Sequence, residues 1–135
     1  MNKNSSPDII LVDDDPICNM LNELLIREML PYSQITIFSD SLEAHHFLME
    51  SLENPKPTTT IIFLDINMPK MSGWELLDDL QDHILKVKQR YKIYMLSSSL
   101  DPRDNDNAKT NPLVSGFFEK PLNRFDFLTT GDSHL

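Results

Sequence analysis

Short apolar runs alternate with helical patterns along most of the chain. Several of these runs are continuous, without intervening polar residues, which is typical of strands buried on both faces of a parallel sheet. The predicted strands are Ile9–Val12, Ile35–Phe38, Ile61–Leu64, Ile93–Leu96 and Gly116–Phe118. Their alternation with helices predicts an α/β fold.

Three of the segments between the strands carry apolar residues at three- and four-residue steps. This spacing predicts amphipathic helices with one face toward the core. The stripes are Ile17, Leu21, Leu24 and Leu25, then Ala44, Phe47, Leu48 and Leu52, then Leu77, Leu80, Ile84 and Val87. Two helix starts have the spacing of a capping box, namely Ser72 with Glu75 and Asp40 with Glu43.

A fourth helix is predicted over about Pro102–Thr110, because Asp101 before a proline is typical of an N-cap followed by the first helical residue. Ala108 is almost its only apolar helix former, so we expect few buried contacts to hold it. A short fifth helix is predicted with Asn123 as its cap, Arg124–Thr130 as its body and Gly131 as its stop.

The order strand then helix is repeated five times. This order predicts a doubly wound, five-stranded parallel sheet with helices on both faces, and right-handed crossovers leave few topologies for it. In such sheets the functional crevice lies at the carboxyl ends of the strands. The residues that directly follow each strand are therefore the candidates for function.

Composition limits the class of protein and its partners. The chain has 135 residues, 40% of them hydrophobic, which suits one globular domain with a substantial core. With 21 acidic and 12 basic residues the formal net charge is −9, which argues against direct binding to nucleic acid. Cys18 is the only cysteine, so no disulfide can form within the chain.

Targeting signals are absent from the sequence. The apolar runs are too short to cross a membrane, and no signal-peptide core follows the polar N-terminus. We therefore expect a cytoplasmic protein without membrane insertion. Its expected organisation is a disordered tail at 1–7, one domain over 8–130, a short tail at 131–135 and no output domain.

Polar groups follow four of the predicted strands. They are Asp13, Asp14 and Asp15 after the first strand, Asp65 after the third, Ser97 after the fourth and Lys120 after the fifth. Clustered carboxylates repel each other unless a cation binds, and hard oxygen ligands suit Mg²⁺ or Ca²⁺. Each residue alone has an ordinary explanation: an aspartate before a helix commonly caps it, as Asp15 before Pro16 would, and a lysine or serine at a strand end is commonly solvated. Because a parallel sheet places all of these residues at one edge, together they predict a functional site that binds a cation.

Asp65 is the candidate nucleophile of this site. An aspartate can carry a phosphoryl group as a mixed anhydride, and that chemistry depends on charge neutralisation and positioning. A metal ion would offset the repulsion between the carboxylate and the incoming phosphate, and the Lys120 ammonium would add a second positive charge. The Ser97 hydroxyl can donate a hydrogen bond to a phosphate oxygen.

Together these segments resemble the receiver domain of two-component response regulators, in particular stand-alone members similar to the chemotaxis regulator. The resemblance rests on IILVDDDP at 9–16, LDINMP at 64–69 with SGWE at 72–75, MLSS at 95–98 and GFFEKP at 116–121. It extends over nearly the whole chain. The resemblance implies the flavodoxin-like receiver fold with strand order 2-1-3-4-5.

The resemblance also implies roles for individual residues. Asp65 would accept the phosphoryl group. Mg²⁺ would be bound by the carboxylates of Asp14 and Asp65, by the backbone carbonyl of Asn67 and, through water, by Asp13. Lys120 would pair with the phosphate, and the peptide bond before Pro121 would be cis.

Three further positions belong to the expected switch. Ser97 would follow the phosphate with its hydroxyl, and Phe117 stands at the family's switch aromatic. Ser98 replaces the usual alanine, so we expect access to the phosphate to differ. Phe117 lacks the hydroxyl of the tyrosine-bearing members, so it cannot report the switch through a hydrogen bond.

The function implied is that of a single-domain response regulator in a phosphorelay. A histidine kinase or histidine phosphotransfer protein would phosphorylate Asp65 with Mg²⁺, and the modified protein would change its binding to an unidentified downstream protein. It would be no enzyme beyond its own phosphotransfer and autodephosphorylation, and a monomer or weak dimer. Two alternatives stay open: a pseudo-receiver that only binds partners, and an aspartate-nucleophile phosphohydrolase, since Asp65 and Asn67 match part of an Asp-x-Asp motif.

Overall fold

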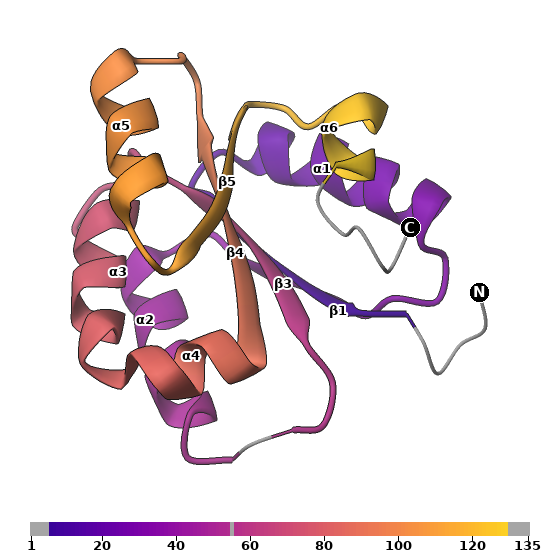
Figure 1. The fold of residues 1–135 in the computed structure, drawn as a ribbon. Helices are drawn as coiled ribbons and strands as arrows, with labels where there is room; N and C mark the ends of the chain where they lie inside the picture. Colours follow the sequence, from indigo (N-terminus) through magenta and orange to yellow (C-terminus); the bar gives the residue numbers. More distant parts are fainter. Residues whose placement is uncertain (1–5, 55, 130–135) are drawn as a thin grey trace.

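The computed structural model describes residues 6–54 and 56–129. Its five strands form a parallel sheet in the order β2-β1-β3-β4-β5, which confirms the predicted fold class and strand order (Figure 1). The strands are β1 (Asp8–Val12), β2 (Ile35–Phe38), β3 (Thr60–Asp65), β4 (Tyr91–Ser97) and β5 (Val114–Glu119). Most of the predicted tails at 1–7 and 131–135, and the predicted helix stop at Gly131, lie outside the described residues.

Helices cover both faces of the sheet (Figure 1). The helices on one face are α1 (Pro16–Met29) and α6 (Arg124–Leu128), and those on the other are α2 (Ser41–Ser51), α3 (Gly73–Leu80), α4 (Ile84–Arg90) and α5 (Pro102–Thr110). Successive side chains of a strand point to opposite faces. β1 therefore sends Ile10 and Val12 into one apolar cluster and Ile9 and Leu11 into the other.

The register of the sheet brings the carboxyl ends of its inner strands to one edge. Val12 of β1 pairs with Leu64 of β3, which pairs in turn with Met95 of β4. Ser97 at the end of β4 pairs with Glu119 at the end of β5. The polar residues that end or follow these strands are thus assembled by the sheet itself.

The predicted inner face of α1 is wrong. Ile17, Leu21 and Leu24 are 63%, 43% and 60% exposed, and only Leu25 of the predicted stripe packs against the core. The buried residues of α1 are Cys18, Asn19, Asn22 and Ile26. The apolar periodicity is misleading here because two of the inward positions hold asparagines, which are buried with hydrogen bonds to neighbouring loops.

The third predicted stripe spans two helices. α3 ends at Leu80, a 3₁₀ turn, η2, occupies Gln81–His83, and α4 begins at Ile84. Leu77, Leu80 and Val87 are buried as the stripe predicts, and Ile84 packs against the same cluster while partly exposed. The short 3₁₀ turn preserves the apolar face across the change of helix.

Side-chain caps begin α1, α2, α3, α5 and α6, whereas α4 has no side-chain cap hydrogen bond. Ser72 and Glu75 form a complete capping box at α3. Asp15 and Asp101 accept backbone N–H groups at the starts of α1 and α5. Asp40 accepts from Leu42 N at the start of α2, which is an aspartate cap and not the complete capping box expected with Glu43. The last helix, α6, is capped by Asn123 and ends at Leu128, short of the predicted Thr130, which is not described.

The α5 helix is attached by few contacts. Ala108 is its only buried residue, in agreement with its polar sequence. A side-chain hydrogen bond joins it to α3, where Trp74 Nε1 donates to Asp104 Oδ1 over 3.0 Å. Among the helices that the structure describes, none is both long enough and apolar enough to cross a membrane.

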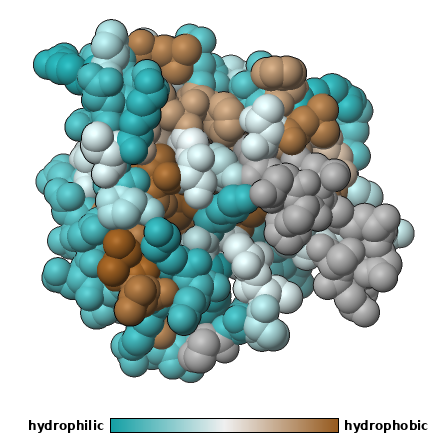
Figure 2. Space-filling model, viewed as in Figure 1, coloured by the Kyte–Doolittle hydropathy of each residue, from teal (hydrophilic) through white to brown (hydrophobic). Residues whose placement is uncertain are grey.

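The face seen in Figure 2 is mainly hydrophilic, with separate hydrophobic areas over α4 and around α6. Leu85 on α4 and Phe125 on α6 are each 75% exposed. Leu128 on α6 is also exposed. Phe127 packs the last helix onto the sheet, because it is fully buried in the cluster beneath α1 and α6.

Candidate functional site

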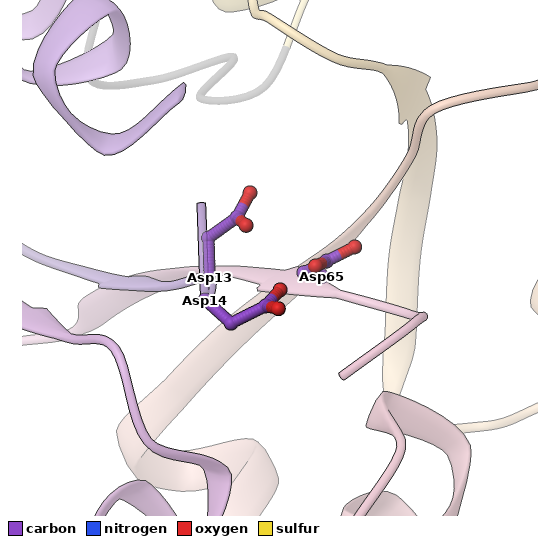
Figure 3. Close-up of side chains that lie close together, drawn as sticks. All are labelled: Asp13, Asp14 and Asp65. Atoms are coloured by element: carbon purple, nitrogen blue, oxygen red, sulfur yellow. The ribbon is translucent and has the colours of Figure 1, made fainter. Parts of the chain in front are cut away.

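Three carboxylates meet at the carboxyl edge of the sheet. Asp13 follows β1, Asp14 comes next, and Asp65 is the last residue of β3; one carboxylate oxygen from each lies within 4.8 Å of the others. Figure 3 shows the Asp14 side chain reaching toward that of Asp65 from the neighbouring strand end. Asp13 and Asp65 are each 1% exposed, whereas Asp14 is exposed to solvent. The cluster is thus open on one side.

Lys120 provides the positive charge next to the two buried carboxylates. Its Nζ lies 3.2 Å from Asp13 Oδ2 and 3.3 Å from Asp65 Oδ2. Burial favours the neutral amine, but the charges of Asp13 and Asp65 outweigh it and raise the pKa of Lys120 above its usual value. The lysine is therefore a fixed cation in the site at neutral pH.

Asp65 is buried next to a second negative charge, that of Asp13. Its burial, and next the negative charge of Asp13, raise the pKa of Asp65 to about 7, although Lys120 acts in the opposite direction. Asp65 Oδ2 accepts no hydrogen bond from the part of the chain that the structure describes, despite its ion pair with Lys120. Lys120 is shared with Asp13 and compensates this buried carboxylate only in part, so a further cation or hydrogen-bond donor would stabilise its ionised form.

These features fit a divalent cation with hard oxygen ligands. Three carboxylates carry more negative charge than one lysine neutralises, and Mg²⁺ is commonly held by one or two carboxylates with water and phosphate completing its shell. Asp14 and Asp65 face the same space (Figure 3) and can bind such an ion. The exposure of Asp14 leaves that space accessible from solvent.

The turn after β3 depends on a close approach of two backbone segments. Gly73 N, at the start of α3, donates to Ile66 O over 2.9 Å. A Cβ atom on Gly73 would lie 2.6 Å from the backbone oxygen of Asp65. Asn67 is exposed on this turn, and its N–H donates to Asp65 Oδ1 over 3.3 Å. Glycine at position 73 therefore allows α3 to begin directly beneath the candidate nucleophile.

Ser97 lies at the end of β4, where a backbone hydrogen bond links it to the segment that carries Lys120. Lys120 N donates to Ser97 O over 2.8 Å. The Ser97 hydroxyl is itself engaged locally: it donates to Ser99 O and accepts from Ser99 N. Ser98 beside it is exposed. Reorientation of this hydroxyl toward Asp65 would require the release of the Ser99 contacts.

The remaining predicted residues, Phe117 and Pro121, lie on β5 and directly after Lys120. Phe117 is partly buried on β5, where its ring packs against the apolar cluster on the α2–α5 face. The peptide bond between Lys120 and Pro121 is cis, and Pro121 is exposed. The sheet thus brings together Asp13, Asp14, Asp65 and Lys120, with Ser97 adjacent.

Sequence reasoning missed two residues beside the site, Asn19 and Asn22 on α1. Asn19 Nδ2 donates to the carbonyl of Asp13 over 2.8 Å, and Asn22 Oδ1 accepts from Leu122 N over 2.9 Å. Both are buried. The available signal was their spacing of three residues, which places them on one face of a helix together with Cys18 and Ile26.

The comparisons with known proteins agree with this geometry. Residues 9–130 match the model of the response regulator receiver domain family. A solved two component response regulator from Cytophaga hutchinsonii is 33% identical with a TM-score of 0.85, and the match covers 95% of this chain and 96% of that one.

Two more distant solved structures have the same fold. A response regulator receiver protein from Dyadobacter fermentans is 24% identical, with a TM-score of 0.75 over 91% of this chain and 95% of its own. Chemotaxis protein CheY4 from Vibrio cholerae is 21% identical, with a TM-score of 0.70 over 96% of this chain and 99% of its own. The comparison with curated proteins gave no match.

Proposed function

Because the chain belongs to the response regulator receiver domain family, we propose that it is a phosphorylation-dependent signalling module whose acceptor is Asp65. A histidine kinase or histidine phosphotransfer protein would donate the phosphoryl group. The observation that carries the assignment is the Asp65 carboxylate itself. It is buried at the sheet edge, lies beside two further carboxylates and Lys120, and keeps an oxygen without a hydrogen-bond donor among the described residues.

The transfer itself is a displacement at phosphorus. An oxygen of the ionised Asp65 carboxylate attacks, the bond from phosphorus to the donor's histidine nitrogen breaks, and the leaving imidazole keeps the electron pair of that bond. The product is an acyl phosphate on Asp65. The protein's part is to position the carboxylate and to stabilise the charge on the phosphoryl oxygens.

A divalent cation belongs to this proposal through the carboxylates that would hold it. Asp14 and Asp65 would bind Mg²⁺ directly, Asp13 through water, and Asn67 through its backbone carbonyl. When bound, Mg²⁺ would offset the repulsion between the carboxylates and the incoming phosphate. Burial and the charge of Asp13 disfavour the ionised form of Asp65, and the same positive charge would stabilise it.

Lys120 and Ser97 would bind the phosphoryl oxygens once Asp65 is modified. The Lys120 ammonium already lies 3.3 Å from Asp65 Oδ2, close enough to pair with a phosphoryl oxygen on that residue. The Ser97 hydroxyl would exchange its local bonds with Ser99 for one to the phosphate. Its movement would alter the loop that leads into the weakly attached α5, and Phe117 beside that helix would repack.

A donor protein would dock beside the open side of the site. The exposed apolar side chains of α1 (Ile17, Met20, Leu21 and Leu24) form one face of the helix that begins two residues after Asp14. Exposed apolar groups gathered on one helix face favour a partner with an apolar surface of its own. The negative formal charge of the chain favours a partner with basic residues around that surface.

Intact-mass measurement tests the proposed function. The protein is incubated with acetyl phosphate and Mg²⁺, with EDTA as the metal-free arm. We expect a gain of one phosphoryl group that needs Mg²⁺ and is lost in Asp65→Asn. Asp82→Asn, which removes an exposed carboxylate in the 3₁₀ turn η2, serves as the matched control and should be labelled like the wild type.

Three outcomes would count against the proposal. Labelling that persists in Asp65→Asn would place the acceptor elsewhere. An absence of labelling, combined with no binding of Mg²⁺ or beryllofluoride, would favour a pseudo-receiver that acts by binding alone. Release of phosphate over many turnovers from a phosphate ester would instead favour a phosphohydrolase.

A further inference from the structure

The inner face of α1 contacts both charged loops of the site. Asn19 and Asn22 are 5% and 1% exposed, and lie one helical turn apart on that face. Asn19 reaches the acidic loop, where its Nδ2 donates to Asp13 O. Asn22 reaches the lysine loop, where its Oδ1 accepts from Leu122 N across 100 residues of sequence.

The segment that carries Lys120 is therefore held on both sides of the lysine. At Lys120 itself, the backbone N–H donates to Ser97 O over 2.8 Å. Two residues later in the sequence, Leu122 N donates to Asn22 Oδ1 over 2.9 Å. Leu122 is also buried, so its N–H has little water to bond with if the asparagine is lost.

We propose that Asn22 is a positioning residue for phosphoryl transfer, one that fixes the lysine loop and thereby the place of the Lys120 ammonium opposite Asp65. This inference rests on the proposed function. The ammonium must meet oxygens that arrive only with the phosphoryl group, and a displacement of about 1 Å can cost a large factor in rate. Asn22 touches none of the reacting atoms: its Oδ1 accepts from Leu122 N, and its Nδ2 donates to Cys18 Sγ within α1 over 3.6 Å.

Asn19 provides an internal comparison because it lies on the same helix face but holds the other loop. Its loss would disturb Asp13, and with it the carboxylates that would bind the metal. Mutation of a residue that hydrogen-bonds to a metal ligand and orients it commonly lowers metal affinity by about tenfold or more. A purely structural role for both asparagines predicts that their variants behave alike, whereas the positioning role predicts that they differ.

The test compares Asn22→Leu with Asn19→Leu in two measurements. Mg²⁺ affinity is measured by calorimetry, and phosphoryl uptake from acetyl phosphate is measured by intact mass at saturating Mg²⁺. For Asn22→Leu we expect uptake to slow by at least about tenfold with Mg²⁺ affinity unchanged. For Asn19→Leu we expect Mg²⁺ affinity itself to fall by about tenfold.

Three controls make the result decisive. Asn22→Asp keeps an oxygen acceptor for Leu122 N and should recover much of the lost rate. Asn107→Leu, an exposed position on α5, should behave like the wild type. Hydrogen exchange at the Leu122 amide should become faster in Asn22→Leu, and this readout does not depend on any phosphoryl chemistry. If Asn22→Leu does not fold, Asn22→Ala takes its place in every arm.

The proposal is overturned if uptake in the folded Asn22 variant equals the wild-type rate, or if Mg²⁺ affinity and uptake fall together. It is also overturned if Asn22→Asp is as slow as Asn22→Leu while its Leu122 amide stays protected. A wild-type protein that takes up no phosphoryl group and binds neither Mg²⁺ nor beryllofluoride would refute the proposed function instead, and the Leu122 exchange data would still report whether Asn22 anchors the loop.

Discussion

Replacing Asp65 with asparagine should stabilise the metal-free protein, and the gain should grow with pH. Asparagine has nearly the shape of a protonated aspartic acid and carries no charge. The Asp65 side chain is buried beside Asp13, and the pKa of Asp65 is raised from its ordinary 3.8 to about 7, chiefly by burial. The folded protein therefore holds a proton on Asp65 at pH values where the unfolded chain has released it.

The sign follows from this difference in bound protons. Between about pH 4 and pH 7 the folded state binds more protons than the unfolded state, so stability falls as pH rises through that window. A difference of about 3 pKa units at ~1.4 kcal/mol each gives a penalty of at most about 4 kcal/mol above pH 7. Asp65→Asn removes the penalty but also one of the two partners of Lys120. We expect a net gain of about 2 to 4 kcal/mol at pH 8.

The assay is urea unfolding in EDTA at several values between pH 4.5 and 8. The difference in unfolding free energy between Asp65→Asn and wild type should be smallest at the acidic end and largest at pH 8. Asp14→Asn is the control, since its exposed carboxylate should contribute little when removed. Adding Mg²⁺ should narrow the gap, because the ion stabilises the folded wild type. A difference that is constant with pH, or that favours the wild type at pH 8, would refute the argument.

Three further predictions follow from single contacts. Gly73→Ala should lower the unfolding free energy by about 1 to 3 kcal/mol in urea, because the new Cβ would meet the Asp65 backbone oxygen; an unchanged value would mean that α3 can move away. Cys18 should resist alkylation by iodoacetamide at pH 8 until urea unfolds the chain, since burial, followed by the charge of Asp13, raises the pKa of its thiol to about 12; rapid labelling of the native protein would contradict this. Trp74→Phe should speed hydrogen exchange across α5 by removing the bond to Asp104, with exchange in α2 as the internal control.

The sheet and its strand ends could be predicted because short stretches of sequence indicate each strand, and several strands carry the same kind of pattern. Each strand is a compact apolar run, and β3 is buried at every position, as a continuous run indicates. The polar residues come directly after these runs, so the parallel arrangement alone brings Asp13, Asp65 and Lys120 together. An error of one residue in the pairing register of the strands would have shifted the candidate residues slightly, but it would have left them at the carboxyl edge of the sheet.

Other features depend on contacts between segments that no local pattern encodes. The change from α3 to α4 through η2 occurs within a stripe that reads as one continuous helical face. The tie between Trp74 and Asp104 joins α3 to α5 across 30 residues of sequence. Neither residue has a neighbour in the sequence that would indicate this partner.

The α1 helix shows why an apolar stripe can predict the wrong face. The rotation of a helix about its axis depends on everything that its inner side chains contact, and polar side chains contribute as soon as buried partners exist for them. In α1 the bonds from Asn19 to the acidic loop and from Asn22 to the lysine loop are both satisfied only when Ile17, Leu21 and Leu24 face solvent. The same rotation thus anchors the two charged loops of the site and leaves an apolar surface beside it. Under the proposed function, a donor that covers this surface would contact the very helix that holds Asp13 and the Lys120 loop in place.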